Sequence, residues 1–307
     1  MRAVARAIPR EVKDGFRYDE IPWRRFWHFY GPGEEVPGLL DMLASTDAGA
    51  ADRVLWRIRE ALHHQGGTIE AGALAVPFLF RIARARPSGL RAEILRLVGE
   101  IGRCQHLGDG SRAGFLQVSE DSMTMGAAEC PVDWAIQAAR EAVTDDLHLL
   151  LPQLSDLDPE VRSAAAFVLA EVTGEVPRVS TALHGRLAVE EDPAVRVTLV
   201  LAIAQLAQLA REHREHRRHR EHRDEGAPAW ARGLWSDPGR RPEDRIGAGL
   251  AWLCLVDDPA PDELRAFLTD PGTVRFGDAL QGVPWIASVD HVAGLRSCVG
   301  EMLPRGS

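Results

Sequence analysis

The sequence predicts an all-α protein built as a right-handed α-solenoid of about six helical hairpins. One hairpin is written twice in succession within residues 149–210, where the pattern D-P-x-V-R begins at Asp158 and again at Asp192, 34 positions later (192 − 158). A repeat of this length is typical of helical solenoids. Hydrophobic residues make up 45% of the 307-residue chain, whereas aromatic residues make up only 6% and no long β-branched run favours a sheet. We therefore expect one continuous solenoid domain over residues 22–302.

The local chemistry of the repeated unit explains its pattern. Asp158 and Asp192 each precede a helix that their side-chain oxygens can cap. Pro159 and Pro193 follow at the first helical position, where the missing amide would have no partner inside the helix. Neither hairpin can bury its apolar stripe alone, so neighbouring hairpins must stack.

The pattern D-P-x-V-R followed by an Ala-rich helix resembles the HEAT repeat, especially its short bacterial lyase-type form. A second set of motifs, W-x(3–4)-H-x-Y-G-P, V-P-x-L-L, H-Q-G-x-x-x-x-A and A-V-P-F-L, lies within about residues 21–85. Together they resemble a group of actinobacterial HEAT-repeat proteins. The resemblance implies a HEAT-like solenoid and implies no activity.

The N-terminal region divides into two parts. Residues 1–21 are charged and irregular, and we expect a flexible lead-in. Residues 22–33 concentrate aromatic side chains, which favours an N-terminal cap over the open end of the solenoid. The alternative is an aromatic binding lip, formed by Trp23, Trp27, His28 and Tyr30.

Two predicted hairpins follow, the first from segments 36–45 and 50–64 and the second from a segment at 75–79 and one at 88–103. The run His64-Gln-Gly66 fits a helix C-terminus, where histidine favours the negative end of the helix dipole and glycine turns the chain. Ligand contact by His63 or His64 is the alternative. Residues 104–131 break the period, and we interpret them as either a disordered loop or a lid.

The rest of the chain is also predicted to be helical, at 132–144, then through the repeats, and near 228–236, 242–256, 260–269, 275–287 and 290–302. Residues 211–225 alternate arginine, histidine and acid, which indicates a solvated helical extension. Histidine pairs three apart there are a weaker indication of a metal site, and no metal site or cofactor is predicted. Residues 303–307 resemble a protease-site remnant from expression cloning.

Aligning the second helices of the hairpins predicts a binding surface. Glu60, Glu100 and Glu171 fall in register with Gln205. One turn earlier on the same face lie Trp56, Arg96 and Phe167. The second helix lines the concave surface in HEAT-like folds, so these residues predict a short acidic ladder there. The alternative is structural, since a glutamate at this position belongs to the lyase-type consensus.

Charge, cysteines and hydropathy narrow the function classes. A net charge of −9 favours a basic partner and disfavours nucleic acid. The four cysteines lie far apart without a C-x-x-C pair, as in a reduced cytoplasmic protein. No apolar run approaches the length of a membrane span, and no signal peptide begins the chain. We expect a cytoplasmic protein without a membrane partner.

Three functions compete, and we favour a non-catalytic scaffold that grips a protein partner along the concave face. The second is a small-molecule-binding protein or an enzyme, whose acid/base and stacking groups would be Trp27, His28, Glu60, His63 and His64. The third is DNA binding of the kind seen in HEAT-type alkyl-base DNA glycosylases. It ranks last because the arginines are interleaved with acids.

Overall fold

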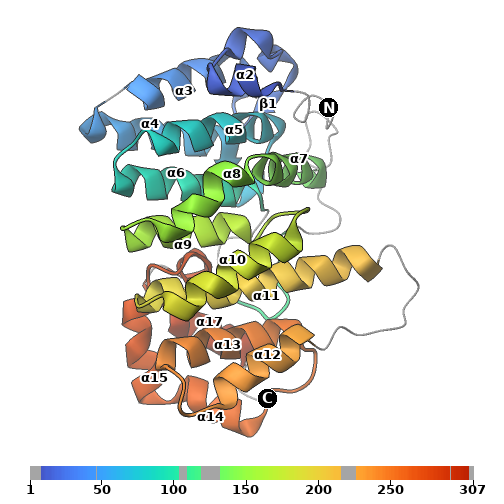
Figure 1. The fold of residues 1–307 in the computed structure, drawn as a ribbon, viewed down its shortest axis with the longest axis vertical. Helices are drawn as coiled ribbons and strands as arrows, with labels where there is room; N and C mark the ends of the chain where they lie inside the picture. The colour runs from blue at the N-terminus through green and yellow to red at the C-terminus, as the bar shows by residue number, and fades with distance from the viewer. Residues whose placement is uncertain are drawn as a thin grey trace. The chain divides into compact units, whose positions relative to one another are not determined.

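The structure, a computed structural model, describes residues 8–45, 47–103, 109–118, 132–215, 226–290 and 292–303. Its described residues contain sixteen α-helices, short 3-10 helices and two small β-hairpins (Figure 1). This confirms the all-α prediction. The chain forms two compact units, the first from Met1–His106 and Val118–Glu175, the second from Leu107–Gln117 and Val176–Ser307.

Unit 1 is organised around a buried helix. Every residue of α5 (Glu70–Arg84) up to Ala83 is buried. Helices α2, α3, α6 and α7 and strand β1 all contact α5. The elements of unit 1 are α2 (Arg10–Asp14), β1 (Trp27–His28), β2 (Gly31–Pro32), α3 (Val36–Ser45), α4 (Ala48–Leu62), β3 (His63–His64), β4 (Gly67–Thr68), α5, α6 (Ser88–Ile101), α7 (Val132–Asp145), α8 (Leu147–Leu150) and α9 (Pro159–Leu169).

Residues 8–21 fold onto α5, so the prediction of a flexible lead-in is wrong for them. Helix α2 buries Val12, which is 2% exposed, and the Tyr18 ring lies 4.9 Å from that of Phe78 between centroids. Arg81 on α5 donates from Nε to Asp14 at 2.7 Å. The apolar residues of this segment that pack on α5 are interspersed with charged residues in the sequence. Their pattern therefore did not predict a folded segment.

The predicted helix end at His64-Gln-Gly66 is a β-hairpin instead. Helix α4 stops at Leu62, and β3 pairs antiparallel with β4, so His64 lies opposite Gly67. The two turn residues, Gln65 and Gly66, have φ of 50° and 79°. Positive φ at both central positions is the type I′ geometry that suits two-residue hairpins. The left-handed glycine is therefore present, but it turns a hairpin and does not end a helix.

The two predicted aspartate caps are confirmed. Asp158 Oδ1 accepts the amide of Glu160 at 2.9 Å, and α9 begins at Pro159. Asp192 Oδ1 accepts the amide of Val195 at 3.0 Å, and α11 (Pro193–Glu215) begins directly after Asp192. One cap lies in each unit.

Unit 2 packs α13 against α11 and α12. Gly247 of α13 would place a Cβ 3.3 Å from Val200, so a small residue permits this close packing. Its helices are α10 (Val176–Val189), α11 (Pro193–Glu215), α12 (Gly226–Ser236), α13 (Pro242–Leu255), α14 (Asp262–Thr269), α15 (Pro271–Phe276), α16 (Pro284–Val289) and α17 (Leu295–Met302).

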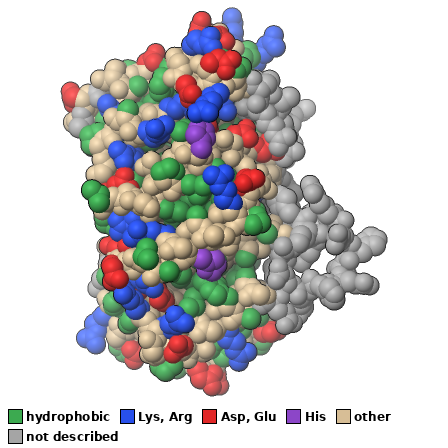
Figure 2. All heavy atoms as spheres, viewed as in Figure 1, with side chains coloured by type: hydrophobic (Ala, Val, Ile, Leu, Met, Phe, Trp, Pro, Cys, Tyr) green, Lys and Arg blue, Asp and Glu red, His purple; other side chains and the backbone are tan. Residues whose placement is uncertain are grey.

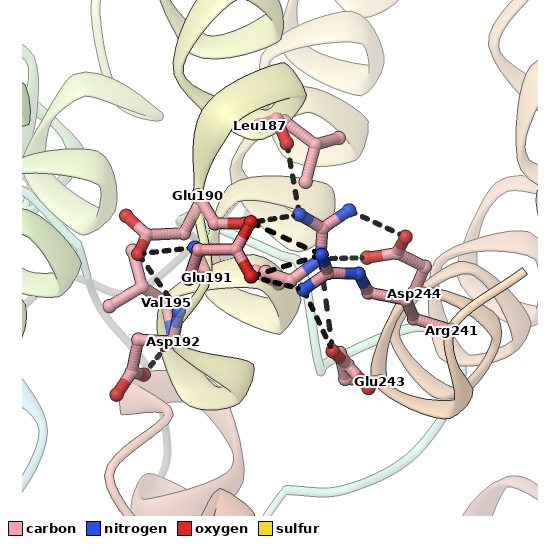
Figure 3. A network of polar contacts seen from close by, with 9 residues as sticks. Leu187, Glu190, Glu191, Asp192, Val195, Arg241, Glu243 and Asp244 are labelled. Carbon is pink, nitrogen blue, oxygen red and sulfur yellow. Dashed lines mark hydrogen bonds and ion pairs between the residues drawn. The ribbon is translucent and has the colours of Figure 1, made fainter.

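A polar network ties the start of α11 to α13 (Figure 3). Arg196 donates to both carboxylate oxygens of Asp244, at 2.8 and 2.7 Å, and to the carbonyl of Glu190 at 2.5 Å. Arg241 pairs with Glu191 at 3.0 Å. A bidentate arginine–carboxylate pair fixes direction as well as distance. The network therefore sets the register of α13 against α11.

The middle of the 104–131 insertion is folded within unit 2. Phe115 is fully buried, and Arg112 donates from Nε to the carbonyl of Leu253 at 2.7 Å. The Gly110 amide donates to Glu301 at 2.8 Å. Residues 104–108 and 119–131 lie outside the described residues, so the choice between loop and lid stays a prediction there.

The C-terminal helices differ in part from the prediction. The helix expected at 275–287 is interrupted, because α15 ends at Phe276 and α16 begins only at Pro284. A proline in the middle of a helix interrupts it, whereas a proline in the first turn is well tolerated. Helix α11 continues to Glu215 as expected, and the remainder of the 211–225 tract lies outside the described residues.

Among the described residues, one helix reaches membrane length, whereas the sequence predicted no apolar run of that length. The 18-residue window Pro193–Ala210 of α11 is apolar enough to span a bilayer by length and composition. Of that window, 72% is buried inside the structure. Core helices of soluble proteins pass the same test, so this is weak evidence for a membrane segment.

Candidate functional site

Three large aromatic side chains stand exposed in unit 1. Trp56 is 61% exposed, Tyr30 64% and Trp27 42%. Helix α4 buries Leu55 and Ile58, so Trp56 points away from the core that this helix covers. Tryptophan and tyrosine are the residues that most often dominate binding interfaces. These side chains are the first candidates for a binding surface.

Glu60 joins Tyr30 to helix α4. The Tyr30 hydroxyl donates to Glu60 Oε2 at 3.2 Å, and His64 Nδ1 lies 3.0 Å from the same oxygen. Desolvation is the largest cause, and the hydrogen bond to Glu60 the second, that raises the pKa of the Tyr30 hydroxyl. The hydroxyl therefore remains a donor. Glu60 lies one turn after Trp56 on the same helix face. We call Trp56, Tyr30, Glu60 and His64 the aromatic platform.

Two residues of the predicted aromatic lip are buried, so that prediction is wrong for them. Trp23 is 4% exposed and donates from Nε1 to the carbonyl of Tyr18 at 3.1 Å. His28 is 2% exposed, accepts the Tyr30 amide on Nδ1 at 3.2 Å and lies 2.9 Å from Glu35 through Nε2. Because Nδ1 accepts, the ring proton is on Nε2. His28 therefore shapes the loop that presents Tyr30.

His63 has a structural position across the β3–β4 hairpin. Its Nδ1 lies 3.1 Å from the hydroxyl of Thr68, which is buried. Burial, and then the charges of Arg59 and His64, lower the pKa of His63 to about 3. The imidazole is therefore neutral at physiological pH. The expectation of ligand contact remains for His64, whose side chain is 31% exposed.

Beside the aromatic platform, α6 presents a paired row of charges. Arg59 forms an ion pair with Glu100. Arg96 donates to Glu93 at 2.6 Å and lies 4.0 Å from Glu160 of α9. Glu100 and Arg96 are half-buried, with side chains 30% and 25% exposed. The row therefore alternates in sign and does not form a purely acidic ladder.

Phe167 and Glu171 do not reach the surface, so the predicted ladder is wrong for them. Phe167 is 3% exposed and Glu171 is fully buried. Arg103 donates from Nε to Glu171 at 2.7 Å, and its guanidinium lies 3.8 Å from the centroid of the Phe167 ring. Arg140 donates to the carbonyl of Glu171 at 2.9 Å. The structural alternative for this glutamate is the correct one.

The arginines that bind Glu171 and the glycines that make room for it were not predicted from the sequence. A Cβ on Gly99 would come 2.5 Å from Phe167, and a Cβ on Gly102 would come 1.7 Å from Glu171. Two glycines three apart near the end of α6 open the space that the larger side chains fill. The two closely spaced glycines could have indicated this packing. A glycine inside a helix is destabilising, so its presence suggests that close packing needs a small residue there.

Two cysteines lie among the described residues of unit 2. Burial raises the pKa of Cys298 to about 12 and also raises that of Cys254, so neither thiol is an activated nucleophile. Among the residues that the structure describes, no group of three histidine, cysteine, aspartate or glutamate side chains is placed to hold a metal ion. The aromatic platform and its charged row are suited to binding.

Basic and acidic side chains are interspersed on the described surface of each unit that Figure 2 shows. Nucleic-acid binding needs a continuous basic stripe, which this face does not present in the described residues. Comparison of the chain with models of known protein families found no match, and neither did comparison with curated proteins or with solved structures.

Proposed function

We propose that this protein is a non-catalytic interaction scaffold that binds a protein partner through the aromatic platform of unit 1. The observation that carries the proposal is the exposure of Trp56 and Tyr30, at 61% and 64%, with Tyr30 hydrogen-bonded to the Glu60 carboxylate one helical turn from Trp56. Glu60 holds Tyr30 in place before any partner arrives. A preorganised aromatic pair loses little conformational entropy on binding, which favours affinity.

The partner class that fits is a basic peptide segment or a basic surface patch. A lysine or arginine side chain could stack on the open face of Trp56 while it reaches Glu60 one turn away. The net charge of −9 would accelerate the encounter with such a partner. Neither the stacking on Trp56 nor the attraction between opposite charges needs a catalytic group.

We also propose that the two aspartate-capped hairpins are HEAT-like, and that the aromatic platform belongs to the concave side of a solenoid of such hairpins. Support comes from the 34-residue repeat and from matched hydrogen bonds. Arg162 and Arg196 each donate to the carbonyl six residues earlier, at 2.9 and 2.5 Å. Equivalent side chains that make equivalent local bonds are expected of structural repeats.

The test is a pull-down from the native cell extract at low and high salt, with the wild-type protein and two variants. We expect one stoichiometric partner at low salt and its loss at high salt, because screening weakens exposed charge pairs. Trp56→Ala should weaken capture by about 30-fold or more, as removal of a hot-spot tryptophan does. Glu60→Lys should abolish capture by repelling a basic partner.

Leu157→Ala is the matched control, because Leu157 is an apolar residue of unit 1 that is 97% exposed and lies outside the aromatic platform. It should capture the partner as the wild type does. Equal capture by wild type, Trp56→Ala and Glu60→Lys would remove the platform as the binding surface.

A further inference from the structure

Unit 2 contains an open hollow that the proposed scaffold function does not use. Its volume is about 1090 Å³, and it lies between α14, α15 and α17. This is slightly larger than the pockets of about 300–1,000 Å³ that hold most small organic molecules, so such a molecule would fit. The described residues that line it are Arg265, Thr269, Pro271, Val274, Arg275, Arg296, Val299, Gly300 and Leu303.

Three arginines from three different helices converge on this hollow. Arg265 comes from α14, Arg275 from α15 and Arg296 from α17, and none of the described lining residues is acidic. The structure records no ion pair for these three side chains within its described residues. Three like charges around one hollow repel one another, and a bound anion would relieve that repulsion.

The neighbouring acid and hydroxyl groups are already engaged. Asp270 caps α15, and its Oδ1 accepts the amides of Gly272 and Thr273 at 2.8 and 3.2 Å. The Thr269 hydroxyl donates to the carbonyl of Arg265 at 2.8 Å. Arg275 uses only Nε locally, toward the carbonyl of Pro271 at 3.2 Å. The terminal guanidinium nitrogens are therefore the groups left to bind a ligand.

The floor of the hollow is apolar. Val299 and Leu303 are buried beneath it, and Val274 and Pro271 form its sides. An inorganic ion would leave this apolar surface wet. A ligand with an aliphatic or aromatic body would cover it and gain hydrophobic free energy.

We infer that this hollow binds a small organic phosphate, with the dianionic phosphate between the three guanidiniums and an apolar body on the Val299–Leu303 floor. Guanidinium groups match phosphate oxygens in planar, two-point hydrogen bonds. A dianion neutralises two of the three positive charges, whereas a carboxylate neutralises one. We therefore expect a phosphate monoester to bind more tightly than a carboxylate of equal chain length.

Isothermal titration of the full chain with hexyl phosphate, hexanoate, inorganic phosphate and hexanol tests each part of this site. We expect saturable one-to-one binding of hexyl phosphate, weaker binding of hexanoate and of inorganic phosphate, and no binding of hexanol. Arg296→Gln and Arg275→Gln should each raise the Kd for hexyl phosphate about tenfold, the effect of losing a charge-assisted hydrogen bond. Val274→Ser should bring the Kd for hexyl phosphate closer to that for inorganic phosphate.

Arg232→Gln is the control, because Arg232 is an exposed arginine of α12 that does not line the hollow. It removes the same charge from the same unit and should leave the Kd unchanged. Circular dichroism of each variant would confirm that it is folded. The inference is overturned if hexyl phosphate does not bind saturably, if hexanoate binds as tightly, or if Arg296→Gln and Arg232→Gln bind it equally.

Discussion

The two copies of the repeated hairpin share the local structure at the start of the second helix but differ in what holds them in the core. In both copies an aspartate caps the second helix and an arginine four residues later closes the preceding turn. Arg162 donates to the Asp156 carbonyl in unit 1, and Arg196 donates to the Glu190 carbonyl in unit 2. These bonds lie within one hairpin, so the repeated sequence reproduces them.

The copies diverge at one equivalent buried position. Glu171 in unit 1 and Gln205 in unit 2 are both fully buried. Glu171 accepts a charged hydrogen bond from Arg103, at 2.7 Å. Gln205 accepts a neutral one from the Trp285 indole, at 2.9 Å. The same place in the repeat therefore carries a polar link to a distant segment, in one copy ionic and in the other uncharged.

The largest expected loss of stability comes from breaking the ion pair between Arg103 and Glu171 in the first copy. Arg103→Met should lower the free energy of unfolding by about 3–5 kcal/mol at pH 8, because it leaves the Glu171 carboxylate buried without its partner. Urea denaturation followed by circular dichroism measures it. Arg53→Met, which alters an exposed arginine of α4, is the control and should change stability by less than about 0.5 kcal/mol. A loss as small as the control's would show that Arg103 does not compensate Glu171.

The next effect is a pH dependence that only the ionic copy should show. Burial, partly opposed by Arg103 and Arg140, raises the pKa of Glu171 from 4.5 to about 7. Between these values the folded state binds a proton that the unfolded state has released. The contribution of Glu171 is therefore fully present below pH 4.5 and is lost as the pH rises through about 7.

Glu171→Gln should remove this fall, which is on the order of a few kcal/mol. Unfolding free energies of both proteins measured from pH 5 to 8 give the two slopes. Glu263→Gln, at an exposed carboxylate of α14, should keep the wild-type slope. Identical slopes for wild type and Glu171→Gln would show that Glu171 does not titrate in this range.

Removal of the buried hydrogen bond should destabilise the protein less in the neutral copy than in the ionic copy. Trp285→Phe removes the indole donor and leaves the Gln205 oxygen buried without that bond, at a cost of about 1–3 kcal/mol. The loss should be nearly independent of pH, because neither group ionises. A Trp285→Phe loss that varied with pH as strongly as the contribution of Glu171 would contradict the distinction between the copies.

The smallest effect should be equal in both copies. Asp158→Ala and Asp192→Ala each remove one helix cap and should each cost about 1 kcal/mol. Differential scanning calorimetry of the two variants and the wild type compares them directly. Losses that differ by more than about twofold would mean that the hairpins are not locally equivalent.

The sequence by itself determined the features that depend on short-range bonds. The caps at Asp158 and Asp192 and most helix boundaries follow from side chains a few residues apart, so they could be predicted without knowledge of the fold. Gly66 was also predicted to take a left-handed conformation, because few other residues tolerate it. Whether that turn ended a helix or joined two strands depended on the pairing of His63–His64 with Gly67–Thr68.

Tertiary structure decided which side chains face solvent. Trp23 and Trp56 are each followed directly by an arginine in the sequence, yet one is 4% and the other 61% exposed. Glu60 and Glu171 share a register position, but only Glu171 meets a guanidinium from a residue 68 positions away along the chain. Local patterns do not specify such distant partners, because burial is fixed by the helices that pack over each residue. For that reason the sequence named Trp56 and Glu60 as candidates, but their exposure beside the hydroxyl of Tyr30, and the arginine-lined hollow of unit 2, became visible only in three dimensions.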